Sequence, residues 1–119
     1  MSGQTNIGNK PTIKVYYNQN AIDKEAFEPL LHGIEEEGIP YAISGMEEDD
    51  IFNLSHEASK DSKLGVGLGI NSDKIALHYE KLDRLSPLFK IELQNKNQTL
   101  RDLGANATRL VKRIPFKKI

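Results

Sequence analysis

Three consecutive glutamates, Glu35, Glu36 and Glu37, place three carboxylates close together, where they could bind a cation or a basic group. They close a predicted helix, whose carbonyl end already carries partial negative charge, so each exposed acid there costs about 0.3–1 kcal/mol. The apolar stripe of this helix is centred between Leu30 and Leu31, so at about 100° per residue Glu36 points almost directly away from the core. The run is interpreted either as a solvated helix end or as a site for a cation or a basic partner, with Glu36 free to reach another molecule.

A second polar stripe follows the last predicted helix. It consists of residues at spacings i, i+4, i+7 and i+11, namely Asp102, Asn106, Arg109 and Arg113. The two arginines repel slightly at this spacing. The pattern fits either a solvated face or a flank that binds an acidic partner. The second interpretation predicts that these four residues, together with Glu35 and Glu37, form an interface with another protein.

Three glycines, Gly65, Gly67 and Gly69, invite a nucleotide-binding interpretation. A dinucleotide fingerprint must lead from a strand into a helix, whose N-terminus holds the phosphate. Here the glycines lie inside a predicted strand that leads to another strand, which favours close backbone packing instead. The sequence contains no Gly-Lys-Ser or Gly-Lys-Thr phosphate loop, so we expect no ATP hydrolysis by this chain alone.

The histidines do not form a recognisable centre. His32, His56 and His78 are scattered without i, i+4 spacing, and the sequence has no cysteine, which argues against zinc. A packed or hydrogen-bonded imidazole is favoured over a catalytic base for His78. No acid, base and nucleophile converge in the sequence, so we expect a non-catalytic chain.

Hydrophobic periodicity predicts the elements that must position these residues. The predicted order is β-α-β-α-β-β-β-α, with strands at 12–18, 41–46, 64–70, 74–80 and 88–93. Alternating strands and helices imply helix layers on a mostly parallel sheet, and the short turn after residue 70 forces one strand to run antiparallel.

Local signals predict where the helices begin and end. Pro29 fits only a first turn, so the first helix should begin near Ala26, and Gly38 suits the left-handed residue after its end. The second helix is predicted around 51–58. Thr99 is predicted to cap the third helix with Asp102 as its partner, and the apolar stripe of that helix extends to residue 114.

Composition limits the function classes. The chain has 119 residues, predicted to form one α/β domain at 12–119 after a flexible tail at 1–11. The net charge of −1 predicts no nucleic-acid or anionic-membrane partner, although an acidic first half and a basic end could polarise a docking surface. No stretch approaches the roughly 18 apolar residues of a membrane span.

Two segments, Leu30–Pro40 and Gly104–Phe116, carry a family resemblance together with Ala76–Tyr79 and Ser86–Phe89. Taken in their order along the chain, these segments resemble the small subunit of the reactivating factor for adenosylcobalamin-dependent diol and glycerol dehydratases. The pattern from Asn106 to Phe116 is the most specific block.

This resemblance implies a three-layer α/β/α sandwich with a five-stranded mixed sheet and one antiparallel strand. It implies a large chaperone-like ATPase partner that binds ATP or ADP, transient contact with dehydratase, and release of damaged cobalamin by subunit exchange. It also implies that Glu36 helps to ligate magnesium at the large-subunit interface. A cytoplasmic location is expected, while association with a bacterial microcompartment and a homodimer of the isolated chain are left open.

Two alternatives remain at this stage. The medium subunit of the dehydratase belongs to the same superfamily, but it is usually longer. A stand-alone ligand-binding domain with an anticodon-binding-like fold is the alternative from a different class, and the weak basicity argues against RNA.

Overall fold

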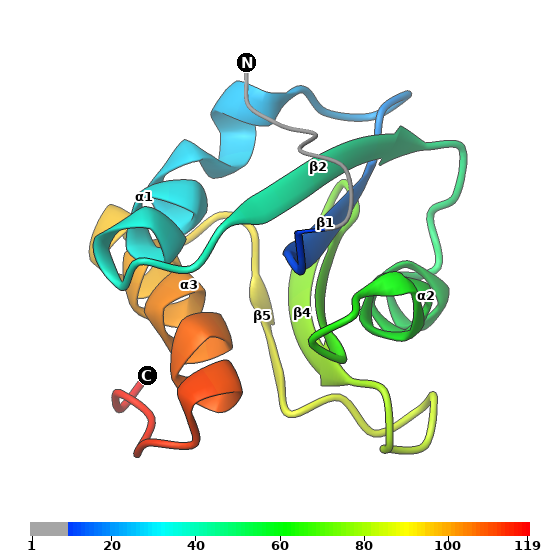
Figure 1. Ribbon diagram of the computed structural model, residues 1–119. Helices are drawn as coiled ribbons and strands as arrows, with labels where there is room; N and C mark the ends of the chain where they lie inside the picture. The colour runs from blue at the N-terminus through cyan, green and yellow to red at the C-terminus, as the bar shows by residue number, and fades with distance from the viewer. Residues whose placement is uncertain (1–9) are drawn as a thin grey trace.

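The computed structural model describes residues 10–119 and has three layers, with helices on both faces of one sheet (Figure 1). The strands are β1 (Ile13–Asn18), β2 (Tyr41–Met46), β3 (Val66–Ile70), β4 (Lys74–Tyr79) and β5 (Phe89–Glu92). Helices α1 (Glu28–Glu36) and α3 (Asn97–Lys112) lie together on one face, and α2 (Ile51–Asp61) covers the other. The tail predicted at 1–11 falls mostly on residues 1–9, which lie outside the described residues.

The sheet has the strand order β2-β1-β3-β4-β5. Strand β1 pairs in parallel with both β2 and β3, whereas β4 pairs antiparallel with both β3 and β5. Strand β4 is therefore the one strand that runs against the other four, which confirms the predicted mixed sheet. The β3–β4 turn is held by Asn71, whose Oδ1 accepts the N–H groups of Asp73 (2.8 Å) and Lys74 (2.7 Å).

The glycines of β3 allow α2 to lie directly on the sheet. A Cβ atom at Gly67 would lie 2.2 Å from the backbone N of Ser59, and one at Gly69 would lie 2.4 Å from the backbone N of Ser55. Both distances are far below van der Waals contact, so only glycine fits there. The prediction of close backbone packing is confirmed.

Helix α1 begins at Glu28, two residues after the predicted Ala26, and the predicted start of α3 is wrong. Pro29 lies in the first turn of α1, after a 3-10 turn η1 at Lys24–Phe27, and Gly38 beyond its end has φ 84°. Helix α3 starts at Asn97 with Lys96 as its N-cap, and no side chain caps it, so the predicted Thr99 cap is wrong. Thr99 lies instead inside the first turn, where its N–H donates to the carbonyl of Lys96 at 3.0 Å.

The end of α3 also differs from the prediction. The helix stops at Lys112 because Arg113 adopts a left-handed conformation, with φ 59° and ψ 43°. Ile114 therefore leaves the helix and is 42% exposed, rather than closing the apolar stripe. The left-handed residue turns the last residues back along α3 (Figure 1), where Lys117 bonds to Asn106 and the ring of Phe116 packs against that of Phe89 on β5.

The main core lies between the sheet and the α1/α3 pair. Its fully buried side chains come from both helices and the central strands: Ile13, Val15, Phe27, Leu30, Ile34, Leu68, Ile75, Leu77 and Leu103. Glycines bring the two helices into backbone contact. A Cβ atom at Gly33 would lie 2.0 Å from the carbonyl oxygen of Arg101, and one at Gly104 would lie 2.0 Å from that of Leu30. This crossing brings the acidic end of α1 against α3.

Within residues 10–119, no helix combines the length and apolar character needed to cross a bilayer.

Candidate functional site

Glu36 lies at the exposed end of α1 and is paired within the chain. Its Oε2 accepts a hydrogen bond from Nε of Arg101 on α3 at 2.9 Å and forms an ion pair with Nη2 of the same arginine, also at 2.9 Å. The hydrogen bond from Arg101 is the main cause that lowers the pKa of Glu36 below its ordinary value. Glu36 is therefore accessible, but it is not the unengaged carboxylate that the helical wheel predicts.

The two neighbouring glutamates point to different partners. Glu35 Oε2 accepts from the hydroxyl of Tyr41 at 2.9 Å, and burial together with this hydrogen bond raises the pKa of Tyr41 to about 12. Glu37 is partly buried, and its Oε2 lies 3.4 Å from Nη2 of Arg109. The three carboxylates thus diverge instead of converging on one ion.

The polar stripe of α3 also divides into separate contacts. Asp102 accepts from Nε2 of Gln98 at 2.8 Å, and its Oδ1 lies 3.5 Å from Nζ of Lys117. Arg109 donates from Nη1 to the carbonyl of Pro115 at 3.2 Å. Arg113 is exposed at the helix end. Asp102 and Arg109 are therefore partly exposed, and both contact the C-terminal segment, Asp102 through Lys117 and Arg109 through Pro115.

Asn106 does not fit the interface role predicted for it. Its side chain is 0% exposed, and both ends of its amide are bonded to one backbone unit. Oδ1 accepts the N–H of Lys117 at 2.6 Å, and Nδ2 donates to the carbonyl of Lys117 at 3.0 Å. Asn106 instead anchors the C-terminal segment, residues 113–119, to the helix.

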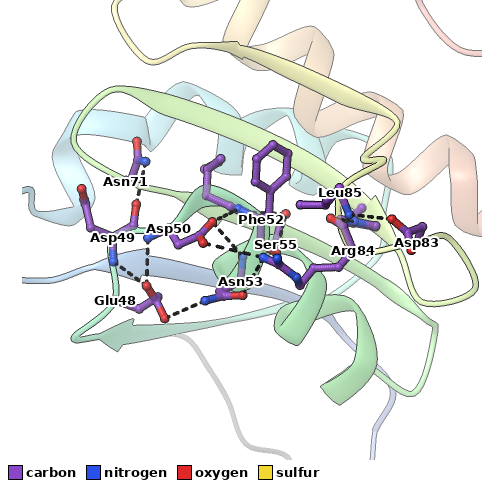
Figure 2. A network of polar contacts seen from close by, with 12 residues as sticks. Glu48, Asp49, Asp50, Phe52, Asn53, Ser55, Asn71, Asp83, Arg84 and Leu85 are labelled. Carbon is purple, nitrogen blue, oxygen red and sulfur yellow. Dashed lines mark hydrogen bonds and ion pairs between the residues drawn. The ribbon is translucent and has the colours of Figure 1, made fainter.

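The acidic stretch after β2 forms a polar network at the start of α2, as Figure 2 shows. Glu48 Oε2 accepts the N–H groups of Asp49 (3.0 Å) and Asp50 (2.9 Å). Asp50 caps α2 by accepting the N–H of Phe52 at 2.9 Å, and its Oδ2 lies 3.6 Å from Nη1 of Arg84. These acids fix the loop before α2 and the first turn of that helix.

In the part of the chain that the structure describes, no three His, Cys, Asp or Glu side chains form a metal-binding group.

His78 is a structural residue, as predicted. It is 0% exposed, its Nε2 lies 3.0 Å from the carbonyl of Arg84, and its Nδ1 lies 3.0 Å from the backbone N–H of Tyr79. Its ring contacts that of His56 at a centroid distance of 4.8 Å, with the two ring planes tilted by 46°. Both ring nitrogens are engaged by backbone groups, so His78 ties the segment after β4 to the sheet.

Arg101 is the residue of this site that sequence reasoning missed. It lies beside Asp102 but belongs to no polar stripe, and its partner Glu36 is 65 positions away. The sequence does show a basic residue on the last helix and an acidic end on the first. It does not show that the two helices cross there, because that crossing depends on the close contacts of Gly33 and Gly104.

Comparison with known proteins places these features in a family. Residues 10–117 match the family model for the dehydratase medium subunit. The chain is 37% identical over 108 residues to the propanediol dehydratase-reactivating factor small subunit of Citrobacter freundii, which covers 91% of each chain. It is 36% identical over 90 residues to the diol dehydratase-reactivating factor small subunit of Klebsiella michiganensis, covering 76% of this chain and 72% of that one.

Solved structures agree with the sequence matches. The fold superposes with a TM-score of 0.86 and 31% identity on a chain of the diol dehydratase-reactivating factor complexed with ADP and Mg²⁺, covering 92% of this chain and 100% of that chain. A glycerol dehydratase reactivase gives a TM-score of 0.87 and 31% identity, covering 91% and 97%. With a shared fold and identities above 30% over most of its length, the chain belongs to the dehydratase medium subunit family, among the small subunits of diol and glycerol dehydratase-reactivating factors.

Proposed function

We propose that this chain is the small, non-catalytic subunit of an ATP-dependent reactivase that releases damaged cobalamin from a diol or glycerol dehydratase. The observation that carries the proposal is the match over 91% of both chains to a reactivating-factor small subunit. A small subunit implies a hetero-oligomer with a large subunit. We assign nucleotide binding and ATPase activity to that large subunit, because Gly67 and Gly69 pack against α2, Gly65 lies beside the side chain of Glu80, and the sequence has no phosphate loop.

Magnesium at the subunit interface is part of this proposal. Mg²⁺ prefers oxygen ligands, keeps several waters and uses only one or two protein carboxylates. Glu36 fits such a role as a single donor, since its carboxylate is exposed and both of its contacts with Arg101 fall on Oε2. The other protein ligands would come from the large subunit. Arg101 would have to share or release the carboxylate when the ion binds.

The proposed mechanism is subunit exchange. The small subunit leaves the large subunit, and a related dehydratase subunit takes its place, which opens the dehydratase. The match to the dehydratase medium subunit model supports this view, because two chains that share one fold can bind at the same position on the large subunit. The same match keeps the medium subunit of a dehydratase as the second candidate. We further propose that exchange takes place in the cytoplasm, where a bacterial microcompartment could hold the dehydratase.

The test uses the assembled reactivase with a fluorescent label on the small subunit. Inactivated dehydratase is added with ADP on the large subunit, and we expect the label to leave as cobalamin is released. A label that stays bound after cobalamin release would reject exchange and leave this chain as a fixed structural subunit.

The metal role is tested by affinity. Glu36→Gln should weaken binding to the large subunit in the presence of Mg²⁺ and leave the circular dichroism spectrum unchanged. Glu28→Gln, an exposed acid at the other end of α1, is the matched control. Equal affinities for Glu36→Gln and the wild type would contradict the assignment.

A further inference from the structure

The C-terminal segment, residues 113–119, is fastened to α3 through its backbone. The carbonyl of Pro115 accepts from Nη1 of Arg109 at 3.2 Å. Both backbone groups of Lys117 are bonded to the buried side-chain amide of Asn106. Polar contacts to the backbone therefore set the path of the segment, and its apolar side chains are not needed to hold it in place.

The apolar side chains of this segment remain exposed. Ile114 is 42% exposed and Ile119 is 44% exposed. The ring of Phe116 meets that of Phe89 edge to face at a centroid distance of 5.3 Å and still keeps 39% of its surface exposed. Single apolar residues scattered over a surface need no explanation, whereas a group gathered on one fastened segment marks an interaction site.

The charges beside this apolar group are positive once the ion pairs are counted. Acids of the α1 end and of α3 are each paired with a cation of the same chain: Glu36 with Arg101, Glu37 with Arg109, and Asp102 with Lys117. Glu35 lies on the same helix end to which Lys112 donates. Among residues 10–119, Arg113 and Lys118 have no carboxylate within ion-pair distance. Ile114 and Phe116 thus lie between two unbalanced cations.

The segment is continuous with the surface around Glu36. Nζ of Lys117 lies 3.5 Å from Oδ1 of Asp102, which follows Arg101 on α3. After the hydrogen bond from Arg101, the positive charge of Lys117 also lowers the pKa of Glu36. A partner bound at Glu36 therefore lies next to the C-terminal segment.

Charge and continuity together select the occupant. A second copy related by a two-fold axis would place Arg113 and Lys118 against the same cations, and like charges across an interface are unfavourable. A second copy bound through an acidic site elsewhere would make a head-to-tail contact that does not close. An anionic membrane is favoured by clusters of about four to eight basic residues, more than this segment leaves unpaired. The large subunit has none of these restrictions, and it is the partner that the proposed function places at Glu36.

We propose that the C-terminal segment forms the apolar part of the docking surface for the large subunit, which supplies an apolar pocket for Ile114 and Phe116 and carboxylates for Arg113 and Lys118. The apolar side chains provide most of the affinity, and the two cations set the association rate and its salt dependence. This inference rests on the proposed function for the existence of that partner, and it adds which residues beyond Glu36 contact it.

Binding of the labelled chain to the purified large subunit tests the apolar contact. Ile114→Ser keeps the backbone contacts of the segment and should weaken binding about tenfold or more, as for an apolar residue at the centre of an interface. Leu85→Ser is the matched control. Leu85 is 57% exposed but lies on the α2 side of the sheet, where its neighbour Arg84 bonds to Asn53 (Figure 2). We expect this control to bind like the wild type, and urea unfolding checks that both variants keep their fold.

A pair of charge variants tests the role of the two cations. The double variant Arg113→Gln and Lys118→Gln should associate about fivefold more slowly at low salt, with a flatter salt dependence. The double variant Lys60→Gln and Lys81→Gln removes two exposed cations outside the segment, and we expect it to associate at the wild-type rate.

The outcomes separate this inference from the proposed function. Equal binding of Ile114→Ser and the wild type, or equal losses in Ile114→Ser and Leu85→Ser, would overturn the inference and leave the proposed function standing. A wild-type chain that does not bind the large subunit would remove the proposed function as well. Self-association of the isolated chain that Ile114→Ser abolishes would assign the segment to a second copy instead. Binding to phosphatidylglycerol vesicles with the same loss would assign it to a membrane, and either result would overturn the inference.

Discussion

Arg101 and Glu36 join the two helices of one layer through a single oxygen. Nε of the arginine on α3 donates a hydrogen bond to Oε2 of the glutamate on α1, and Nη2 forms an ion pair with the same oxygen, at 2.9 Å each. The contact spans 65 positions of sequence and lies at the rim of a crossing in which glycine brings the two backbones together. A carboxylate proposed to meet a cation at an interface is thus already held by a cation of its own chain.

The first prediction concerns the titration of Glu36. Because Arg101 lowers its pKa in the folded protein, the pair stabilises the fold fully above the ordinary glutamate pKa, and this contribution is lost as the pH falls through the lowered value. In Arg101→Gln, the Glu36 carboxyl should titrate at a higher pH, near that of an ordinary glutamate. Carboxyl NMR titration measures both midpoints, and an unchanged midpoint in the variant would contradict the pairing.

The second prediction concerns Asn106. Asn106→Ala should lower the free energy of unfolding by about 1–3 kcal/mol, because it leaves the backbone N–H and C=O of Lys117 without their buried partner. Urea unfolding measures the loss, and hydrogen exchange should show faster exchange in the C-terminal segment. Lys117→Ala is the control, since it keeps the backbone groups that Asn106 binds. A larger loss in the control than in Asn106→Ala would show that the side chain of Lys117 holds the segment.

The third prediction concerns the helix crossing. Gly104→Ala should destabilise the protein by about 3 kcal/mol or more, because the new Cβ would lie 2.0 Å from the backbone oxygen of Leu30 and the helices must move apart. This outcome opposes helix propensity, which favours alanine by about 1 kcal/mol. Gln98→Ala, at an exposed position of the same helix, should change stability by about 0.5 kcal/mol or less. Thermal unfolding that ranks the two variants in the reverse order would argue against the close crossing.

The fourth prediction concerns catalysis. The purified chain should hydrolyse no ATP and dehydrate no diol, because the glycines of β3 are packed under α2. Phosphate release and aldehyde formation are the measurements, with the assembled reactivase as the positive control for ATP turnover. Turnover by the isolated chain, free of contaminants, would overturn the assignment of nucleotide chemistry to the large subunit.

Local rules predicted most of the fold, because the decisive residues act on their neighbours. Pro29 cannot lie beyond a first helical turn, Gly38 takes the left-handed position after the helix, and the turn before Lys74 forces a hairpin. The predicted start of α3 was wrong because Thr99 has the residue type of a cap, whereas the backbone hydrogen bonds of the helix begin at Lys96, whose carbonyl accepts from Thr99 and Leu100.

The site was predicted less well, because its contacts cross the whole chain. Helical spacing placed Asn106 on a polar flank, but the left-handed Arg113 folds the C-terminal segment back over that flank and buries it. The helical wheel predicted that Glu36 points outward, but it could not predict the pairing with Arg101. No local sequence pattern relates residues on two helices that are 65 positions apart.

The layer of α1 and α3 has a consequence for the order of events during synthesis. Helix α1 is translated early, yet its apolar face is covered by α3, which begins at Asn97, after all five strands. Before α3 is synthesised, Leu30 and Ile34 lack the side chains of Leu103 and Ala107, which belong to the same core. The domain therefore completes its core only once α3 has emerged, and until then the apolar face of α1 stays uncovered.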